Sequence, residues 1–151
     1  MKLTGFLFAA ALLGACTQAA EENYTRHVDP KIGTGGHGHV FVGANVPFGL
    51  VQVGPTSIPQ TWDWCSGYHA SDSTVIGFSH THLSGTGIGD LFDITVMPVV
   101  GEVTYARGEE NDPASGLWSY ADRTREITKP GYYSVPLVRY GITAELTATE
   151  R

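Results

Sequence analysis

The chain has 151 residues, and nine Lys and Arg against fifteen Asp and Glu give it a formal net charge of −6. An acidic balance argues against a nucleic-acid-binding protein, and the length admits one domain rather than two once a targeting segment is removed. Glycine contributes 19 residues and charged residues only 16% of the chain, against usual shares of about 7% and about 25%. This composition indicates an all-β domain with long loops, outside the cytosol.

The first fifteen residues have the pattern of a secretory signal peptide. Lys2 gives a basic start, and residues 3–13 carry no charge but are too few to cross a bilayer as a helix. Leu13-Gly14-Ala15-Cys16 resembles a bacterial lipobox, so we expect a lipid anchor on Cys16 and attachment to the membrane through it. A plain secretory signal followed by an incidental cysteine is the alternative.

This interpretation divides the chain into three parts. Residues 1–15 are the lipoprotein signal peptide, residues 16–27 are the lipidated cysteine with a polar tether, and residues 28–151 are the folded domain. Cys65 is then the one free thiol, so packing rather than a disulfide must hold the domain together. We expect an exported bacterial lipoprotein on the outer membrane or cell surface, with the periplasm as the alternative location.

Beyond the tether, apolar residues recur with a period of two between glycines and prolines, which predicts strands and little helix. Strands are predicted at residues 50–53, 74–83, 92–100, 132–140 and 142–149. The last two flank Gly141 as a hairpin, and the alternation of apolar and polar residues in the second predicts a sheet packed on one face. Several strands joined by long turns predict an antiparallel β-sandwich.

Residues 107–129 are rich in charged residues, glycine and proline, and we predict a long surface loop there. Trp118 and Tyr120 are exceptions that either pack back on the core or meet a partner. After this loop the chain is strand-like up to Arg151. We therefore expect the sequence to be a fragment of a longer protein.

Residues 33–38 match the pattern G-x-G-x-x-G, which in a dinucleotide-binding site follows a strand and opens a helix. Here Asp29-Pro30 precedes the glycines, and Pro47 follows before a helix could form. We reject a nucleotide site and predict a tight inter-strand loop.

Two pairs of histidines have strand spacing: His37 with His39, and His80 with His82. Residues i and i+2 of a strand point to the same side, so each pair could present two imidazoles to one metal. The spacing shows no third and fourth zinc ligand. Hydrogen-bonded histidines on a polar sheet face or an interface are the preferred interpretation.

Residues 62–69 concentrate aromatic, acidic and imidazole side chains: Trp62, Asp63, Trp64, Tyr68 and His69. Aromatic rings beside carboxylates suit the apolar faces and the hydroxyl groups of sugars. Core aromatics next to a loop aspartate explain the same residues equally well. The residues alone leave both interpretations open.

Several long stretches resemble glycoside hydrolase family 92, and together they span nearly all of residues 28–151. They are Val28 to His39, Pro47-Phe48-Gly49, Trp62-Asp63 with residues 66–69, Ser71-Asp72-Ser73, residues 77–87 and Pro130-Gly131-Tyr132-Tyr133. Ordered matches of this length are far more specific than a short motif.

The resemblance implies an exported, calcium-dependent, exo-acting α-mannosidase that removes terminal mannose from N-glycans or mannan with inversion, most commonly at α-1,2 linkages. Family members have an N-terminal β-sandwich followed by an (α/α)6 catalytic barrel, which supplies the general acid, the general base and most of the calcium site. This sequence resembles the sandwich alone. We therefore expect no catalytic residue in this chain, Ca2+ bound mainly by the missing domain, and no activity of the fragment by itself.

The resemblance also implies that the sandwich forms one wall of the sugar pocket, with Trp62, Asp63, Trp64 and His69 reaching the substrate. Trp64 or Trp62 is the expected platform beside the leaving sugar. The expected partners are mannose-containing glycans and the chain's own C-terminal catalytic domain, and the paired histidines would face that domain. Two other interpretations remain open: a non-catalytic, carbohydrate-binding surface lipoprotein, and a zinc-binding β-domain.

Overall fold

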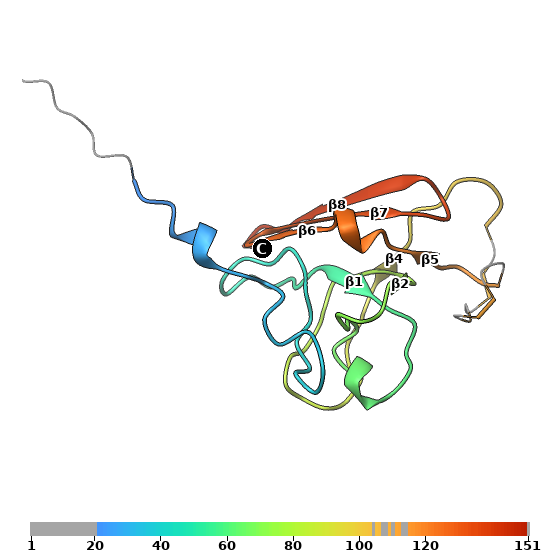
Figure 1. Ribbon diagram of the computed structural model, residues 1–151, viewed down its shortest axis with the longest axis horizontal. Coiled ribbons are helices and arrows are strands. Elements are labelled where there is room, and N and C mark those ends of the chain that lie inside the picture. The colour runs from blue at the N-terminus through green and yellow to red at the C-terminus, as the bar shows by residue number, and fades with distance from the viewer. Residues whose placement is uncertain (1–20, 104, 107–108, 110, 113–114, 151) are drawn as a thin grey trace, which may run out of the picture.

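The computed structural model describes residues 21–103, 105–106, 109, 111–112 and 115–150 (Figure 1). The predicted signal peptide and Cys16 lie outside these residues. The regular structure consists of short antiparallel strands and three 3-10 turns, as the prediction of an all-β chain requires. No helix in the described segments has the length and apolar character needed to span a membrane.

One layer is a three-stranded sheet with the order β6-β7-β8. It comprises β6 (Ile127–Lys129), β7 (Tyr132–Leu137) and β8 (Ile142–Thr147). β7 and β8 pair antiparallel along their whole length. Gly141 turns the chain between them with φ +62°, a conformation that glycine adopts without steric cost. The predicted hairpin is confirmed, although each strand ends two or three residues before its predicted end.

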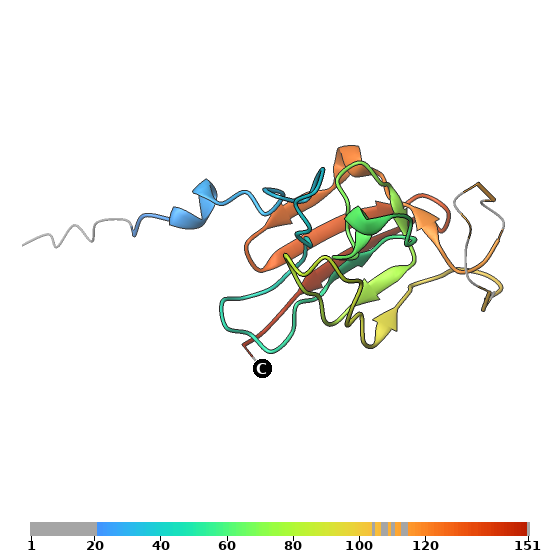
Figure 2. The same ribbon diagram turned by 90° about the horizontal axis from the view of Figure 1, so that it is seen from below.

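The second layer contains β1 (Gly54–Thr56), β3 (Gly77–Ser79) and β4 (Thr95–Val96) in the order β1-β3-β4. Beside it, β2 (Thr74–Val75) pairs with β5 (Ser119–Tyr120). Figure 1 shows these short strands below the β6-β7-β8 sheet, and in Figure 2, which is seen from below, they lie in front of it, so that two antiparallel layers face each other. The arrangement confirms the predicted antiparallel β-sandwich.

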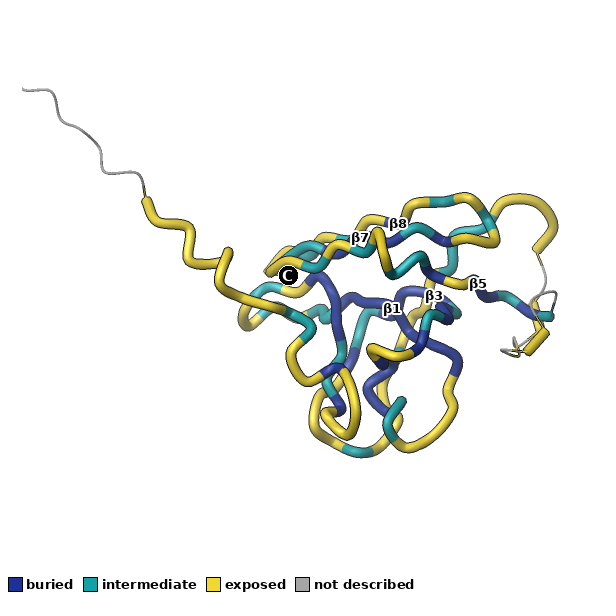
Figure 3. Tube along the Cα trace, in the orientation of Figure 1, coloured by how far each residue is buried: buried dark blue, intermediate teal, exposed yellow. Residues whose placement is uncertain are grey.

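The core lies between the two layers, and both layers contain buried stretches of the chain (Figure 3). Phe78 of β3 and Tyr133 of β7 meet across the interface, with their ring centroids 6.4 Å apart. Around this contact the buried apolar residues of both layers form one cluster: Val42, Ala44, Val53, Tyr68, Val75, Ala121, Val135, Leu137 and Ala144. Burial of this cluster, rather than long strand pairing, holds the second layer in place.

The predicted surface loop at 107–129 is wrong for its second half. Trp118 is only 1% exposed, and β5, the 3-10 turn η3 (Arg123–Arg125) and β6 follow it. Two charges of this second half are paired within the protein, since Arg123 forms a salt bridge with Glu126, whose side chain has no exposed surface. The strand predicted at 74–83 is divided into the two short strands β2 and β3, and of the residues predicted at 92–100 only 95–96 form a strand, β4.

The N-terminal residues of the described part project away from both layers (Figure 1). They include the 3-10 turn η1 (Tyr24–His27), which has no buried residue. Asn23 caps this turn by accepting a hydrogen bond from the Thr25 backbone N–H at 3.1 Å.

Candidate functional site

The site is built around η2 (Trp62–Trp64), a single 3-10 turn between β1 and β2. The backbone N–H of Trp64 donates to Thr61 O at 3.0 Å, and that of Cys65 donates to Trp62 O at 3.1 Å. A turn this short supplies little packing surface of its own. Its two indole rings are therefore positioned by contacts with other segments.

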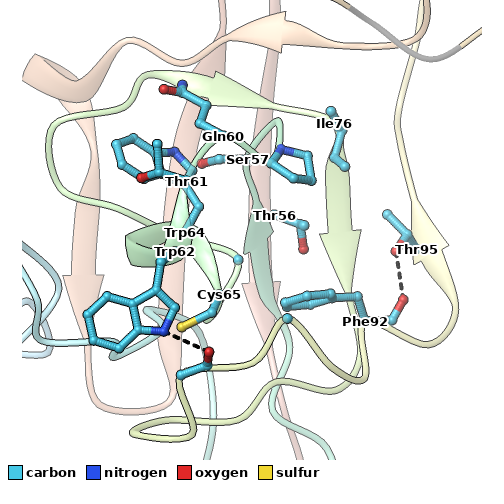
Figure 4. Close-up of a pocket in the computed structure, with 14 residues that line it drawn as sticks. Thr56, Ser57, Gln60, Thr61, Trp62, Trp64, Cys65, Ile76, Phe92 and Thr95 are labelled. Carbon is cyan, nitrogen blue, oxygen red and sulfur yellow. Dashed lines mark hydrogen bonds between the residues drawn. The ribbon is translucent and has the colours of Figure 1, made fainter.

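A cleft of about 370 Å³ opens beside η2 (Figure 4). Both indoles contribute to its wall, and Trp62 is 60% exposed. The other lining residues are Thr56, Ser57, Pro59, Gln60, Thr61, Cys65, Gly67, Ile76, Gly87, Gly89, Phe92 and Thr95. The cleft thus combines broad apolar rings with small hydroxyl and amide groups.

Two contacts fix the Trp62 ring. Its Nε1–H donates to Gly87 O at 2.8 Å, and the His39 ring meets it edge to face, with the centroids 4.2 Å apart. Gly87 has φ +70°, and a Cβ at this position would lie 3.0 Å from Trp62 Nε1. Glycine is required here because the indole rests directly on the backbone.

Asp63 is not among the residues that line the cleft. Its Oδ1 lies 2.6 Å from His37 Nδ1 and 3.2 Å from His39 Nε2. The hydrogen bond from His37 outweighs partial desolvation and lowers the pKa of Asp63. Asp63 is therefore an ionised anchor for the glycine-rich loop.

Trp64 and His69 form a stacked pair, with ring centroids 4.3 Å apart and planes at 19°. Trp64 Nε1–H donates to Asp72 Oδ2 at 2.6 Å. His69 is 8% exposed and bonds to Ser71 Oγ at 2.7 Å and Gly36 O at 3.2 Å. Trp64 reaches the cleft, while His69 supports the ring from behind and ties it to the glycine-rich loop.

The glycine-rich loop at 33–38 consists of turns without a strand before it or a helix after it. Its Thr34 carbonyl accepts a hydrogen bond from Ala70 N–H at 2.9 Å. The predicted tight loop is therefore confirmed in its turns, although it does not join two strands.

The second histidine pair does not converge on one point. His80 Nδ1 bonds to Ile94 O and His82 Nδ1 to Gln52 O, each at 2.7 Å. Burial lowers the pKa of His82, which favours its neutral form. In the segments that the structure describes, no group of three His, Cys, Asp or Glu side chains is placed to hold a metal ion. The described residues therefore do not fit the zinc interpretation.

A buried charge network lies behind the site. Glu126 receives Lys31 Nζ at 2.5 Å, the Tyr133 hydroxyl at 2.7 Å and the Arg123 guanidinium. The Arg123 guanidinium also stacks over the Tyr68 ring, 4.5 Å from its centroid. Burial raises the pKa of Tyr68 to about 12. The network connects η3 and β7 with the loop that carries His69.

Sequence reasoning found the two indoles of the cleft but missed Phe92 and Ser57. Phe92 was predicted as the start of a strand, yet it lies on Gly67, where an added Cβ would be 2.6 Å from the Phe92 ring. The glycine was the available signal, since a positive φ of +82° at Gly67 and a close ring are a common reason for glycine in a loop. Nothing in the sequence distinguishes Ser57 from other loop serines.

Comparison with known proteins identifies the family. The model of the glycosyl hydrolase family 92 N-terminal domain matches residues 27–151. The chain belongs to this family. Its fold superposes on the GH92 α-mannosidase of Bacteroides thetaiotaomicron, solved in complex with mannoimidazole, with 42% identity and a TM-score of 0.80. That match covers 84% of this chain and 17% of the α-mannosidase.

Two further relatives agree with this assignment. The GH92 family glycosyl hydrolase ccman5 is 29% identical, with a TM-score of 0.71 over 85% of this chain and 18% of its own. A protein of Arthroderma benhamiae described as an uncharacterized secreted glycosidase is 28% identical over 154 residues, which is 99% of this chain and 19% of the relative. The chain thus spans less than one fifth of the length of these relatives and corresponds to the N-terminal domain of a glycoside hydrolase.

Proposed function

We propose that the chain is the N-terminal domain of an exo-acting α-mannosidase that removes terminal mannose from N-glycans or mannan. The observation that carries the proposal is the cleft walled by Trp62 and Trp64 within the segment that matches the family. The Bacteroides relative is an α-mannosidase solved with mannoimidazole. An aromatic wall next to small hydroxyl groups suits the C–H face and the hydroxyls of a pyranose ring.

The four predicted substrate residues divide into two roles in this proposal. The exposed ring of Trp62 is the platform on which the sugar stacks, and Trp64 forms the adjoining wall. Asp63 and His69 act indirectly, because one holds His37 and His39 and the other supports Trp64. In this proposal the sugar contacts the two indole rings, whereas the side chains of Asp63 and His69 hold neighbouring residues of the site in place.

The chemistry is proposed to depend on carboxyls outside the described residues. Inversion needs two carboxyls about 6.5–9.5 Å apart, one as acid and one as base. The acidic residues closest to the indoles, Asp63 and Asp72, accept hydrogen bonds from protein groups instead. We accordingly propose that the C-terminal (α/α)6 domain supplies the acid, the base and the Ca2+ site, that the chain alone is inactive, and that α-1,2 linkages are preferred.

Export is part of the same proposal. The Arthroderma relative is described as secreted, which supports export of this chain as well. The lipobox-like residues ending at Cys16 support a lipid anchor, with the outer membrane or cell surface as the location.

A chimaera tests the function directly. Residues 27–151 replace the matching N-terminal segment of the Bacteroides α-mannosidase, and hydrolysis of α-1,2-mannobiose is measured with and without a calcium chelator. We expect hydrolysis that the chelator abolishes. Trp62→Ala should lower kcat/KM by about tenfold or more, because the sugar loses its stacking surface.

Tyr105→Ala is the matched control, since this aromatic side chain is exposed but does not line the cleft. It should leave kcat/KM unchanged. A folded chimaera that binds mannobiose without hydrolysing it would instead favour the non-catalytic carbohydrate-binding interpretation. Equal effects of the two substitutions would remove Trp62 from the proposed sugar contact.

A further inference from the structure

Asp72 is a buried carboxylate directly behind the cleft, with 5% of its surface exposed. Its Oδ2 accepts from Trp64 Nε1–H at 2.6 Å, Thr74 Oγ1–H at 3.0 Å and Gln60 Nε2–H at 3.2 Å. Its Oδ1 accepts from Thr74 N–H at 2.7 Å. All these donors are neutral, so the carboxylate is stabilised by a set of hydrogen bonds.

These bonds hold two separate parts of the cleft wall. Trp64 and Gln60 both line the cleft and both donate to the same oxygen. The Thr74 hydroxyl, held by Asp72, accepts the backbone N–H of Ile58 at 3.0 Å. One carboxylate thus fixes η2 and the segment before it relative to each other.

The orientation of Trp64 depends on two constraints of different kinds. Stacking on His69 sets the plane of the ring, but a stacked ring can still slide and turn within that plane. The hydrogen bond from Nε1 to Asp72 removes this freedom, because an indole has a single N–H donor. A short, charge-assisted bond of this type is stronger than a neutral one.

We propose that Asp72 is a positioning residue for saccharide binding and acts through Trp64. This inference rests on the proposed function, in which Trp64 forms a wall of the sugar cleft. Asparagine is almost the same size, but it has one acceptor oxygen and an NH2 group that only donates. It cannot accept from Trp64 Nε1–H and Thr74 N–H at once, and the oxygen that it keeps is uncharged. Asp72→Asn should therefore weaken or break the bond that holds the indole while keeping the volume filled.

A double-mutant cycle tests the proposal in the 151-residue chain, using Asp72→Asn, Trp64→Phe and the combination. Affinity for α-1,2-mannobiose is measured by calorimetry, and Trp64 order by near-ultraviolet circular dichroism. We expect Asp72→Asn to weaken binding about tenfold and reduce the Trp64 signal. In the Trp64→Phe background the same change should weaken binding less than about twofold, because its target N–H is gone.

Asp93→Asn is the control, since Asp93 is exposed and accepts from Thr81 Oγ1–H at 3.0 Å. It should change neither measurement. Equal losses from Asp72→Asn in both backgrounds would overturn the inference, as they would show that Asp72 acts on the fold generally. If the unmodified chain does not bind mannobiose, the saccharide role falls together with the proposed sugar contact, and the dichroism still decides whether Asp72 orders Trp64.

A second measurement needs no change at Asp72 and covers the case in which Asp72→Asn fails to fold. The indole N–H resonances are recorded by NMR, and that of Trp64 is assigned by its loss in Trp64→Phe. Bonded to a buried carboxylate, it should exchange with solvent at least about tenfold more slowly than the indole N–H of free tryptophan under the same conditions. Exchange as fast as in free tryptophan would overturn the positioning role.

Discussion

Glu126 is the centre of the buried charge network behind the cleft. Lys31 and Arg123 form salt bridges with it, and the Tyr133 hydroxyl donates to it. Glu126→Gln leaves these cations without their counter-charge inside the protein. We expect a loss of about 3 kcal/mol in the free energy of unfolding, measured by urea denaturation. Glu145→Gln is the control, because Glu145 is exposed. If Glu126→Gln costs no more stability than Glu145→Gln, Glu126 does not stabilise the fold through its two salt bridges.

Glu126 also predicts how stability depends on pH. Burial by itself would raise its pKa, but the charge of Arg123 and the bonds from Lys31 and Tyr133 outweigh burial, so the pKa lies below the ordinary 4.5. A carboxyl whose pKa is lower in the folded state stabilises the protein above its unfolded pKa, and this stability is lost as the pH falls through the folded pKa. Urea denaturation at pH 6 and at successively lower pH should show the gap between wild type and Glu126→Gln closing below about 4.5. A difference in stability between the two proteins that stays constant with pH would contradict a lowered pKa of Glu126.

The identity of the site residues could be predicted from the sequence, but their arrangement could not. Trp62 and Trp64 stand out because aromatic residues rarely cluster in a loop beside acids and glycines. Their orientation is set by Gly87 and Asp72, and no local pattern indicates which distant oxygen an indole N–H will meet. For the same reason the sequence did not indicate that Asp63 would hold two histidines.

Among the elements, the junction before β1 leaves no room for a side chain at Gly43. A Cβ on Gly43 would lie 2.2 Å from Val53 O, because the two backbones pass in direct contact beside the bridge between Ala44 and Val53. Gly43→Ala must separate them and should cost about 3 kcal/mol or more of stability. Gly141→Ala has open space around the new methyl group, so only its φ of +62° is strained, at about 1 kcal/mol. Thermal unfolding compares the two variants, and equal losses would show that the close approach does not matter.

The hairpin and the short strands differ in how well their sequences predict them. β8 alternates between apolar and polar residues over six positions, which is long enough for a period of two to be visible, and β7 pairs with it along its whole length. β1 to β5 contain two or three residues each, and β1, β2 and β3 are buried throughout. Such segments have no polar face, so alternation cannot indicate them, and their pairing depends on contacts that close only in the folded chain.

At the scale of the whole molecule, stability and site geometry share one set of contacts. Arg123 pairs with Glu126 and also donates from its Nη2 to the Asp72 carbonyl at 2.9 Å. Tyr68, under the Arg123 guanidinium, immediately precedes His69, which supports Trp64. The layer that carries β7 therefore supports the cleft in the opposite layer through the buried charge network. This linkage explains why so weakly paired a second layer can hold two indoles in fixed positions.

The boundary of the folded unit follows from the same contacts and gives a final prediction. Arg26 belongs to η1, which has no buried residue, whereas Lys31 is held by Glu126 at 2.5 Å. Trypsin needs several residues of extended chain around its target, so the first N-terminal cut should follow Arg26 and leave a stable product that begins at His27, the residue where the family match begins. Mass spectrometry of a time course identifies the cut.

The same digestion of Glu126→Gln tests the role of the salt bridge. In this variant the peptide bond after Lys31 should become sensitive to trypsin as well, because the Lys31 side chain loses its partner. Cleavage after Lys31 as fast as after Arg26 in the unmodified chain would move the domain boundary inward and contradict the role given to this salt bridge.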